Sequence, residues 1–272
     1  MTNDIAALLE ITGWTELGKK RIDIVGTSPA NSLGFEAAFM ERFPKLSRLL
    51  KLARVTDFQT RSKRGGGSAS KAGDFPSDGV VYRLWAWTTH SGQFAAWPAS
   101  PITSIVVPPL ATLSEDHLLI LRHVGGINWL GTCQPEDFED ENHNFALNQN
   151  FIFGMDAPAL STKLWMQEYD FQHQNESADT LIKPYVDFAS PDWVCFAQEA
   201  NGNELLYDRR DGDRVLLVSG DNCFDYVRPS QHYRWQYRSD SYESDTLLQI
   251  NGIVTLRDWA ERLAEQWLAQ VG

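Results

Sequence analysis

The stretch that decides the fold is Asp192–Val218, DWVCFAQEANGNELLYDRRDGDRVLLV. Three apolar runs alternate here with two clusters of turn residues, centred on Asn201-Gly202 and Asp211-Gly212. Asn-Gly and Asp-Gly favour tight hairpin turns because both residues tolerate a positive φ. The stretch therefore predicts a three-stranded antiparallel β-meander, with its acidic side chains at positions that turn chemistry favours.

Two well-delimited helices flank the meander in the sequence. The first, Ser114–Val124, begins with a capping Ser and two acidic residues and is followed by Gly125, a pattern typical of a helix with sharp ends. The second is TLRDWAERLAEQWLAQ, residues 255–270, in which Thr255 and Asp258 have the spacing of a capping box. With the meander, these helices predict the α+β class, as a single, mainly antiparallel sheet with flanking helices.

The first part of the chain has a different character. RIDIV, residues 21–25, alternates like a strand, and RSKRGGGSASKAGD, residues 61–74, has the composition of a solvated linker. GVVYRLWAWTT, residues 79–89, is apolar on both faces and predicts a central strand. We therefore expect an N-terminal α/β extension or small domain over residues 1–106, followed by an α+β domain over residues 107–272.

Two short helices are predicted between the first strand and the linker. One covers residues 35–42, and the other begins at Pro44, because a proline suits the first turn of a helix. Leu46, Leu49 and Leu50 recur at helical spacing in the second of these helices and are expected to face inward.

Composition indicates a folded protein of the cytoplasm. The chain has 272 residues, of which 43% are hydrophobic and 12% aromatic, which excludes disorder over most of the length. No apolar run approaches the roughly 18 residues that cross a bilayer, and the first residues lack the basic segment of a secretory signal. Three cysteines without a CxxC pair, Cys133, Cys195 and Cys223, fit unpaired thiols in a reducing compartment.

The net charge of −12 is unevenly distributed. Residues 112–200 contain 15 Asp or Glu against 3 Lys or Arg. An acidic block of this kind repels nucleic acid and attracts basic protein partners, although a solvated, purely solubilising surface is the alternative. The predicted partner-binding residues are the acids of the loop PEDFEDEN and three acids near the turns of the meander: Glu136, Asp137, Glu139, Asp140, Glu141, Glu199, Asp211 and Asp213.

Motifs for catalysis or cofactor binding are weak. GWTELGKK, residues 13–20, resembles a phosphate-binding loop but has Lys20 where Ser or Thr should hold magnesium, and it leads into a strand instead of a helix. The six histidines show no HxH or HExxH spacing, and no Ser has the GxSxG pattern. We therefore expect no metal, no cofactor and no catalytic residue, with a nucleotide-dependent enzyme as an alternative.

The ten tryptophans raise a further alternative, a carbohydrate-binding or carbohydrate-active protein with indole platforms and paired carboxylates. Five are predicted to lie in the core, because they stand in apolar strands or on the apolar stripe of the last helix: Trp85, Trp87, Trp193, Trp259 and Trp267. The other five are left open for such a role: Trp14, Trp97, Trp129, Trp165 and Trp235.

Three passages resemble the SUKH superfamily, which includes Smi/Knr-type regulators of fungal cell-wall synthesis and many bacterial immunity proteins. LSEDHLLILRHVGGI, residues 113–127, is similar to the family's early helix, although Ser114 replaces the usual Pro and His117 the usual aromatic residue. WVCFAQEANGNELLYDRRDGDRVLLV, residues 193–218, is similar to its central meander. TLRDWAERLAEQWL, from residue 255, is similar to its closing helix, so the resemblance covers about the last 160 residues.

The resemblance implies an α+β domain with one sheet, flanking helices and no catalytic residues. Bacterial members are often immunity proteins that neutralise a toxin, frequently a nuclease, delivered by a neighbouring cell. The acidic composition agrees with this expectation on separate grounds, because an inhibitor of a basic enzyme gains association rate from an acidic face. The sequence thus predicts a non-catalytic cytoplasmic protein-binding domain, most simply an immunity protein against a basic toxin domain.

Overall fold

The computed structural model of the chain describes a framework of residues 22–29, 34–62, 81–92, 94–100, 113–127, 151–153, 181–182, 192–199, 204–218, 227–230, 236–237 and 247–271. Within this framework, helices combine with an eleven-stranded sheet and a separate two-stranded pair, and every strand pairing is antiparallel. The predicted mixed α+β class is confirmed at this level. No framework helix has the length and apolar character that crossing a membrane requires.

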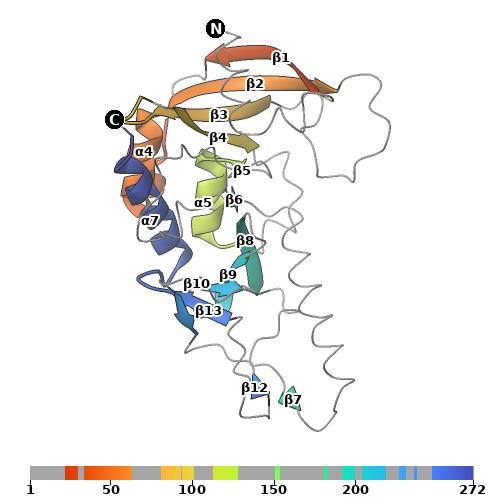
Figure 1. Cartoon of the computed structure of the whole chain (residues 1–272), viewed down its shortest axis with the longest axis vertical. Helices are drawn as coiled ribbons and strands as arrows, with labels where there is room; N and C mark the ends of the chain where they lie inside the picture. Colours follow the sequence, from red (N-terminus) through yellow and green to blue (C-terminus); the bar gives the residue numbers. More distant parts are fainter. Residues whose placement is uncertain are drawn as a thin grey trace.

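The large sheet consists of two groups of strands that are joined by two short strands. Its order is β1 (Ile22–Pro29), β2 (Arg54–Ser62), β3 (Val81–Thr88), β4 (Phe94–Ser100), β5 (Gly126–Ile127), β6 (Phe151–Phe153), β8 (Trp193–Glu199), β9 (Glu204–Asp208), β10 (Arg214–Val218), β13 (Leu247–Ile250) and β11 (Val227–Pro229). The separate pair is β7 (Leu181–Ile182) with β12 (Gln236–Tyr237). The short β5 and β6 join four strands on one side to five on the other, and Figure 1 shows β1 to β4 at the top with β9, β10 and β13 below.

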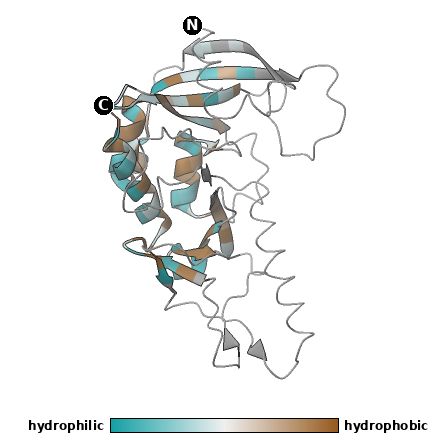
Figure 2. Cartoon of the chain, in the orientation of Figure 1, coloured by the Kyte–Doolittle hydropathy of each residue, from teal (hydrophilic) through white to brown (hydrophobic). Residues whose placement is uncertain are grey.

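The described residues include four α-helices beside these strands: α3 (Ala37–Arg42), α4 (Pro44–Leu52), α5 (Glu115–His123) and α7 (Leu256–Leu268). Figure 2 shows hydrophobic and hydrophilic residues alternating along α5 and α7, as expected of amphipathic helices. The helical prediction at Pro44 is confirmed, and Leu46, Leu49 and Leu50 are buried as expected. These apolar sides meet one face of the sheet in a single core.

Strand β3 is central, as its two-sided apolar pattern predicts. It pairs with β2 on one side and β4 on the other. Trp85 and Trp87 belong to the core under the helices, and Leu84 and Ala86, which alternate with them, are buried on the opposite face. Both faces of this part of the sheet are therefore removed from water.

Elements from both sides of the predicted boundary after residue 106 are joined in the framework. Strand β4 pairs with β5, and α4 packs on α7. The α4 N-terminus lacks a capping side chain of its own, and the Glu261 carboxylate of α7 accepts hydrogen bonds from the amides of Lys45 and Leu46, each at 3.0 Å. The N-terminal region thus contributes to a shared sheet and helix pair, while the division into two domains stays a prediction.

Two strands differ from the sequence-based expectation. Strand β2 continues to Ser62, so the first two residues of the predicted linker belong to a strand, and residues 63–74 lie outside the framework. Strand β4, FAAWPAS, was not predicted, because alanine and proline are both disfavoured in strands. It forms because Pro98 and its neighbours are buried beside β3, where packing outweighs local preference.

Candidate functional site

The predicted acidic site is only partly within the framework. Five of its residues lie outside the described residues: Glu136, Asp137, Glu139, Asp140 and Glu141. Glu199 is the last residue of β8, and its backbone is in register with Phe151 of β6. Asp211 and Asp213 are the predicted residues whose side chains the structure describes, and both belong to the turn between β9 and β10.

That turn has a left-handed backbone at two successive residues. Gly212 has φ 60°, and Asp213, with φ 61°, is the one framework residue other than glycine with a positive φ. The Asp213 amide donates to the Asp208 carbonyl at 3.1 Å, and its carbonyl accepts from the Leu256 amide at 3.2 Å. The Asp-Gly turn predicted from the sequence is confirmed, and it ties the meander to the first residue of α7.

The acidic side chains of this turn are engaged within the chain. Asp208 is 4% exposed, accepts from the Arg210 amide at 2.9 Å and binds the Arg210 guanidinium through both of its oxygens, each at 3.0 Å. Asp211 forms an ion pair with Arg214 on the exposed side of the turn. Turn formation accounts for these contacts, so this part of the predicted binding surface carries little uncompensated charge.

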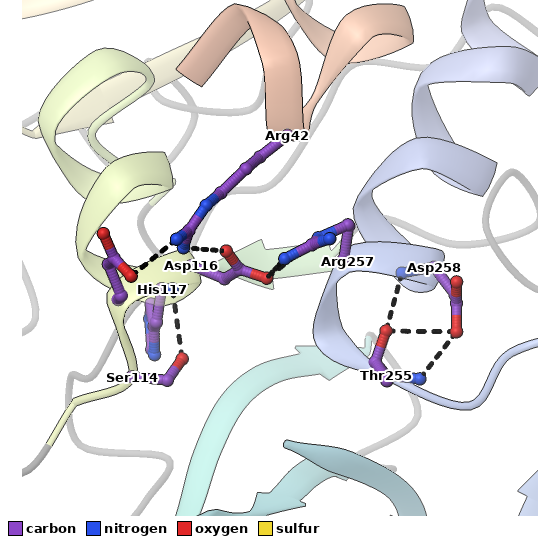
Figure 3. Close-up of polar contacts among 8 residues, drawn as sticks. Arg42, Ser114, Asp116, His117, Thr255, Arg257 and Asp258 are labelled. Carbon is purple, nitrogen blue, oxygen red and sulfur yellow. Dashed lines mark hydrogen bonds and ion pairs between the residues drawn. The ribbon is translucent and has the colours of Figure 1, made fainter. Parts of the chain in front are cut away.

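A three-helix junction, defined by Arg42, Glu115, Asp116 and Arg257, joins these charged side chains through three ion pairs. One oxygen of Asp116 binds Arg42 at 2.9 Å, and the other accepts two hydrogen bonds from Arg257, at 2.9 and 3.1 Å (Figure 3). Arg42 also binds Glu115 at 2.7 Å, which raises the pKa of its guanidinium. The junction joins α3, α5 and α7 through one carboxylate, Asp116, whose side chain is 11% exposed.

Beneath the junction, α5 begins in a buried polar network. The Ser114 side chain caps the helix by accepting from the His117 amide at 3.2 Å, as the sequence predicts. His117 is fully buried, and its Nδ1 lies 3.1 Å from the Tyr207 hydroxyl of β9, which also accepts from the Ser114 amide. Burial lowers the pKa of His117 to about 3 and raises that of Tyr207 to about 12, so both are neutral over the physiological range.

Asp213, in the turn between β9 and β10 of the meander, also belongs to this network, through a hydrogen bond with the Ser114 side chain. Burial raises the pKa of its carboxyl, and the Asp116 charge acts in the same direction. A hydrogen bond from the Ser114 side chain opposes this shift, as do the positive charges of Arg209 and Arg257. Asp213 therefore connects the cap of α5 to the start of α7, which is a positioning role within the fold.

Charge within the framework is nearly balanced. Its residues include 15 Asp or Glu and 14 Lys or Arg. The whole chain has 36 and 24, which leaves 21 acidic and 10 basic residues outside the framework. Ion pairs engage half of the framework cations: Arg42, Lys45, Arg83, Arg210, Arg214, Arg257 and Arg262. Almost all of the net charge of −12 therefore belongs to residues outside the framework.

The framework offers no assembled centre for metal chemistry. Within the described ranges, no group of three or more His, Cys, Asp or Glu side chains is placed to hold a metal ion. The GWTELGKK segment, residues 13–20, whose sequence resembles a phosphate-binding loop, lies outside the described residues, as do His143 and His173. The expectation of a chain without a metal or cofactor stays a prediction.

The described tryptophans are core residues. The five that the sequence places in the core are confirmed there, each at most 3% exposed: Trp85, Trp87, Trp193, Trp259 and Trp267. Trp97, which the sequence leaves open for sugar binding, is buried too, at 1% exposed. Trp14, Trp129, Trp165 and Trp235 lie outside the described residues. Within the framework, no indole is therefore presented to solvent as a stacking platform.

The sequence predicts the α5 side of the junction, because Ser114, Glu115 and Asp116 have the pattern of a cap and an acidic first turn. It does not predict the junction itself. The two arginines that bind Asp116 lie 74 and 141 positions away in the sequence. Nothing in local spacing connects residues so far apart, and the framework brings them together only because α3 and α7 both lie beside the start of α5.

Comparisons with known proteins add no relative. No family model, no curated protein and no solved structure matches this chain. The resemblance of its last 160 residues to the SUKH superfamily therefore stays a prediction from the three passages of sequence that carry it.

Proposed function

We propose that this chain is a non-catalytic, SUKH-like protein-binding protein that acts as an immunity protein against a basic toxin domain. The observation that carries the proposal is the division of charge. The framework has 15 acidic and 14 basic residues, whereas the rest of the chain has 21 and 10. The acidic surplus therefore belongs to residues outside the framework, and it is the feature of this chain that a basic partner would recognise.

A net charge of −12 has an electrostatic cost. Like charges repel one another in the compact state, and a net charge far from zero destabilises it slightly. The same field attracts a basic partner and raises the association rate, since complementary charge steers diffusional encounter. An inhibitor that must capture its toxin before damage occurs benefits directly from such steering.

The order of the framework elements also supports the proposal. The three passages that resemble the superfamily form a capped helix (α5), a three-stranded meander (β8, β9 and β10) and a closing helix (α7), in that order. In addition, His117 is neutral near pH 7 and Asp116 is ion-paired within the chain, as in a structural network. A catalytic acid or base instead needs a proton that it can exchange near neutral pH.

A direct test begins by searching the genes beside this one for a large protein with a basic, toxic C-terminal domain, and the absence of any such neighbour would count against the proposal. Binding of that purified domain to the whole chain is followed by stopped-flow fluorescence at low and high salt. We expect stoichiometric, tight binding with an association rate that falls as salt rises. Glu139→Lys and Asp140→Lys should each slow association several-fold at low salt and flatten its salt dependence.

Glu41→Lys is the matched control, because it makes the same charge change at an exposed framework residue that forms no ion pair within the described residues. It should alter the association rate much less than Glu139→Lys. Equal slowing by all three variants would mean that only total charge matters. Failure of the wild-type chain to bind or neutralise the toxin domain would overturn the proposal.

A further inference from the structure

Helix α3 contacts α5 at both of its ends. At one end Arg42 binds the start of α5 through the three-helix junction. At the other end His123, the last residue of α5, packs against Phe39 and Phe35, with ring centroids 4.4 and 5.7 Å away. One end of α3 is therefore held by ion pairs and the other by a histidine within an aromatic cluster.

The His123 ring is in a poor environment for a positive charge. Its side chain is 9% exposed, and its Nε2 has no hydrogen-bond partner among the residues that the structure describes. Glu36 is the residue before α3. One oxygen of its carboxylate lies 3.8 Å from Nε2 of His123, and its side chain is half-exposed. Burial lowers the pKa of His123 and Arg122 adds to this effect, whereas the Glu36 carboxylate opposes it.

We propose that His123 makes the contact between α3 and α5 a proton-sensitive latch, in which protonation releases the end of α3 that contains Phe35 and Phe39 while Arg42 holds the other end. The neutral ring packs on the two phenylalanines without a solvation cost. The imidazolium, in contrast, regains water only when those rings move away. Opening uncovers two aromatic rings beside a new positive charge, which is a surface absent at neutral pH.

The direction of the pH effect follows from linkage. Because the pKa of His123 is lower in the closed state than the ordinary value of 6.5, the contact has its full strength above about pH 6.5. It weakens as the pH falls below this value and stops weakening below the closed-state pKa. At pH 5.5 the open population can rise by at most about tenfold, the limit for a group whose open-state pKa is 6.5.

Two backbone amides report on the two ends of α3 separately. On the released side, the Met40 amide donates to the Glu36 carbonyl at 3.1 Å; on the held side, the Ser47 amide donates at 2.8 Å to the carbonyl of Phe43, the residue after Arg42. Their hydrogen-exchange protection, corrected for the intrinsic pH dependence of exchange, is measured by NMR in the whole chain at pH 7.0 and pH 5.5. We expect protection of Met40 to fall several-fold more than protection of Ser47.

His123→Phe keeps an aromatic ring and removes the proton site, so protection of Met40 should become independent of pH. Glu36→Gln removes the opposing carboxylate and should deepen the loss, whereas His90→Gln, at an exposed histidine, should behave as wild type. Unchanged or increased Met40 protection at pH 5.5 in the wild-type chain would overturn the latch. A His123 titration midpoint at or above 6.5 by NMR would overturn it even if His123→Phe fails to fold.

Discussion

The two ends of α7 are held in different ways. At the C-terminal end, Trp267 packs against Trp87 and Trp97, with ring centroids 5.2 and 4.9 Å away, and all three indoles are at most 3% exposed. At the N-terminal end, a capping box and an ion pair hold the helix in place. Thr255 and Asp258 form the box, and Arg257 binds Asp116 at 2.9 Å.

This difference separates strength from orientation. Apolar burial is roughly proportional to area and has little directionality, so the indole cluster contributes mainly to the strength of the attachment of α7. The polar end supplies directional bonds that fix the rotation and register of α7 relative to α5. Because Arg257 is about half exposed, the polar end should also respond to salt, whereas the aromatic end should not.

Removing the aromatic anchor should have the largest effect. Trp267→Ala deletes a fully buried indole from the cluster and should lower the free energy of unfolding by about 3 to 5 kcal/mol. The loss should be the same at low and high salt, as measured by urea denaturation. Trp267→Phe, which keeps a ring in the same site, should lose less than half as much. A strong salt dependence of the Trp267→Ala loss would contradict the comparison.

Removing the ionic anchor should have a smaller, salt-dependent effect. Asp116→Ala leaves Arg42 and Arg257 without their shared carboxylate and should lower the free energy of unfolding by about 2 to 3 kcal/mol. The loss is no larger because both arginines are partly exposed and can be hydrated instead. Glu115→Ala is the control on the same helix turn. Its side chain is 69% exposed, so its loss should stay below about 1 kcal/mol. Similar losses for the two variants would show that Asp116 is not the centre of the junction.

Elements with strong local signals were predictable from the sequence, and tertiary pairings were not. The caps at Ser114 and Thr255 and the Asp211-Gly212 turn each depend on side chains within four residues of one another, so their sequence pattern contains the physical cause. Strand β4 has an Ala- and Pro-rich sequence, and its conformation is decided by burial beside β3. Local preference cannot reveal a strand of that kind.

The candidate site shows the same limit more strongly. Charge counting located an acidic surplus, and five of the eight residues chosen from it lie outside the framework. Asp211 and Asp213 were chosen for their position in a turn, but the first is paired with Arg214 and the second is half-buried against α7. The sequence shows which side chains are acidic, and it does not show which of them the fold neutralises.

Acid should weaken the start of α5, which the Asp116–Arg257 ion pair joins to the polar end of α7, through His117. Its pKa is lowered by burial from 6.5 to about 3, so the folded state cannot accept a proton that the unfolded chain binds readily. Stability due to the neutral ring is therefore complete above about pH 6.5 and is lost as the pH falls from 6.5 toward 3. Between pH 7 and pH 5 the expected loss is about 2 kcal/mol, at 1.36 kcal/mol per pKa unit.

Urea denaturation of the wild-type chain and of His117→Gln at both pH values measures this loss. His117→Gln lacks the proton site and should lose about 2 kcal/mol less than wild type over the same interval, even if it is less stable at pH 7. Trp267→Ala, which leaves the α5 network intact, should keep the wild-type pH dependence. If His117→Gln and the wild-type chain lose equal stability, a group other than His117 carries the acid sensitivity of this fold.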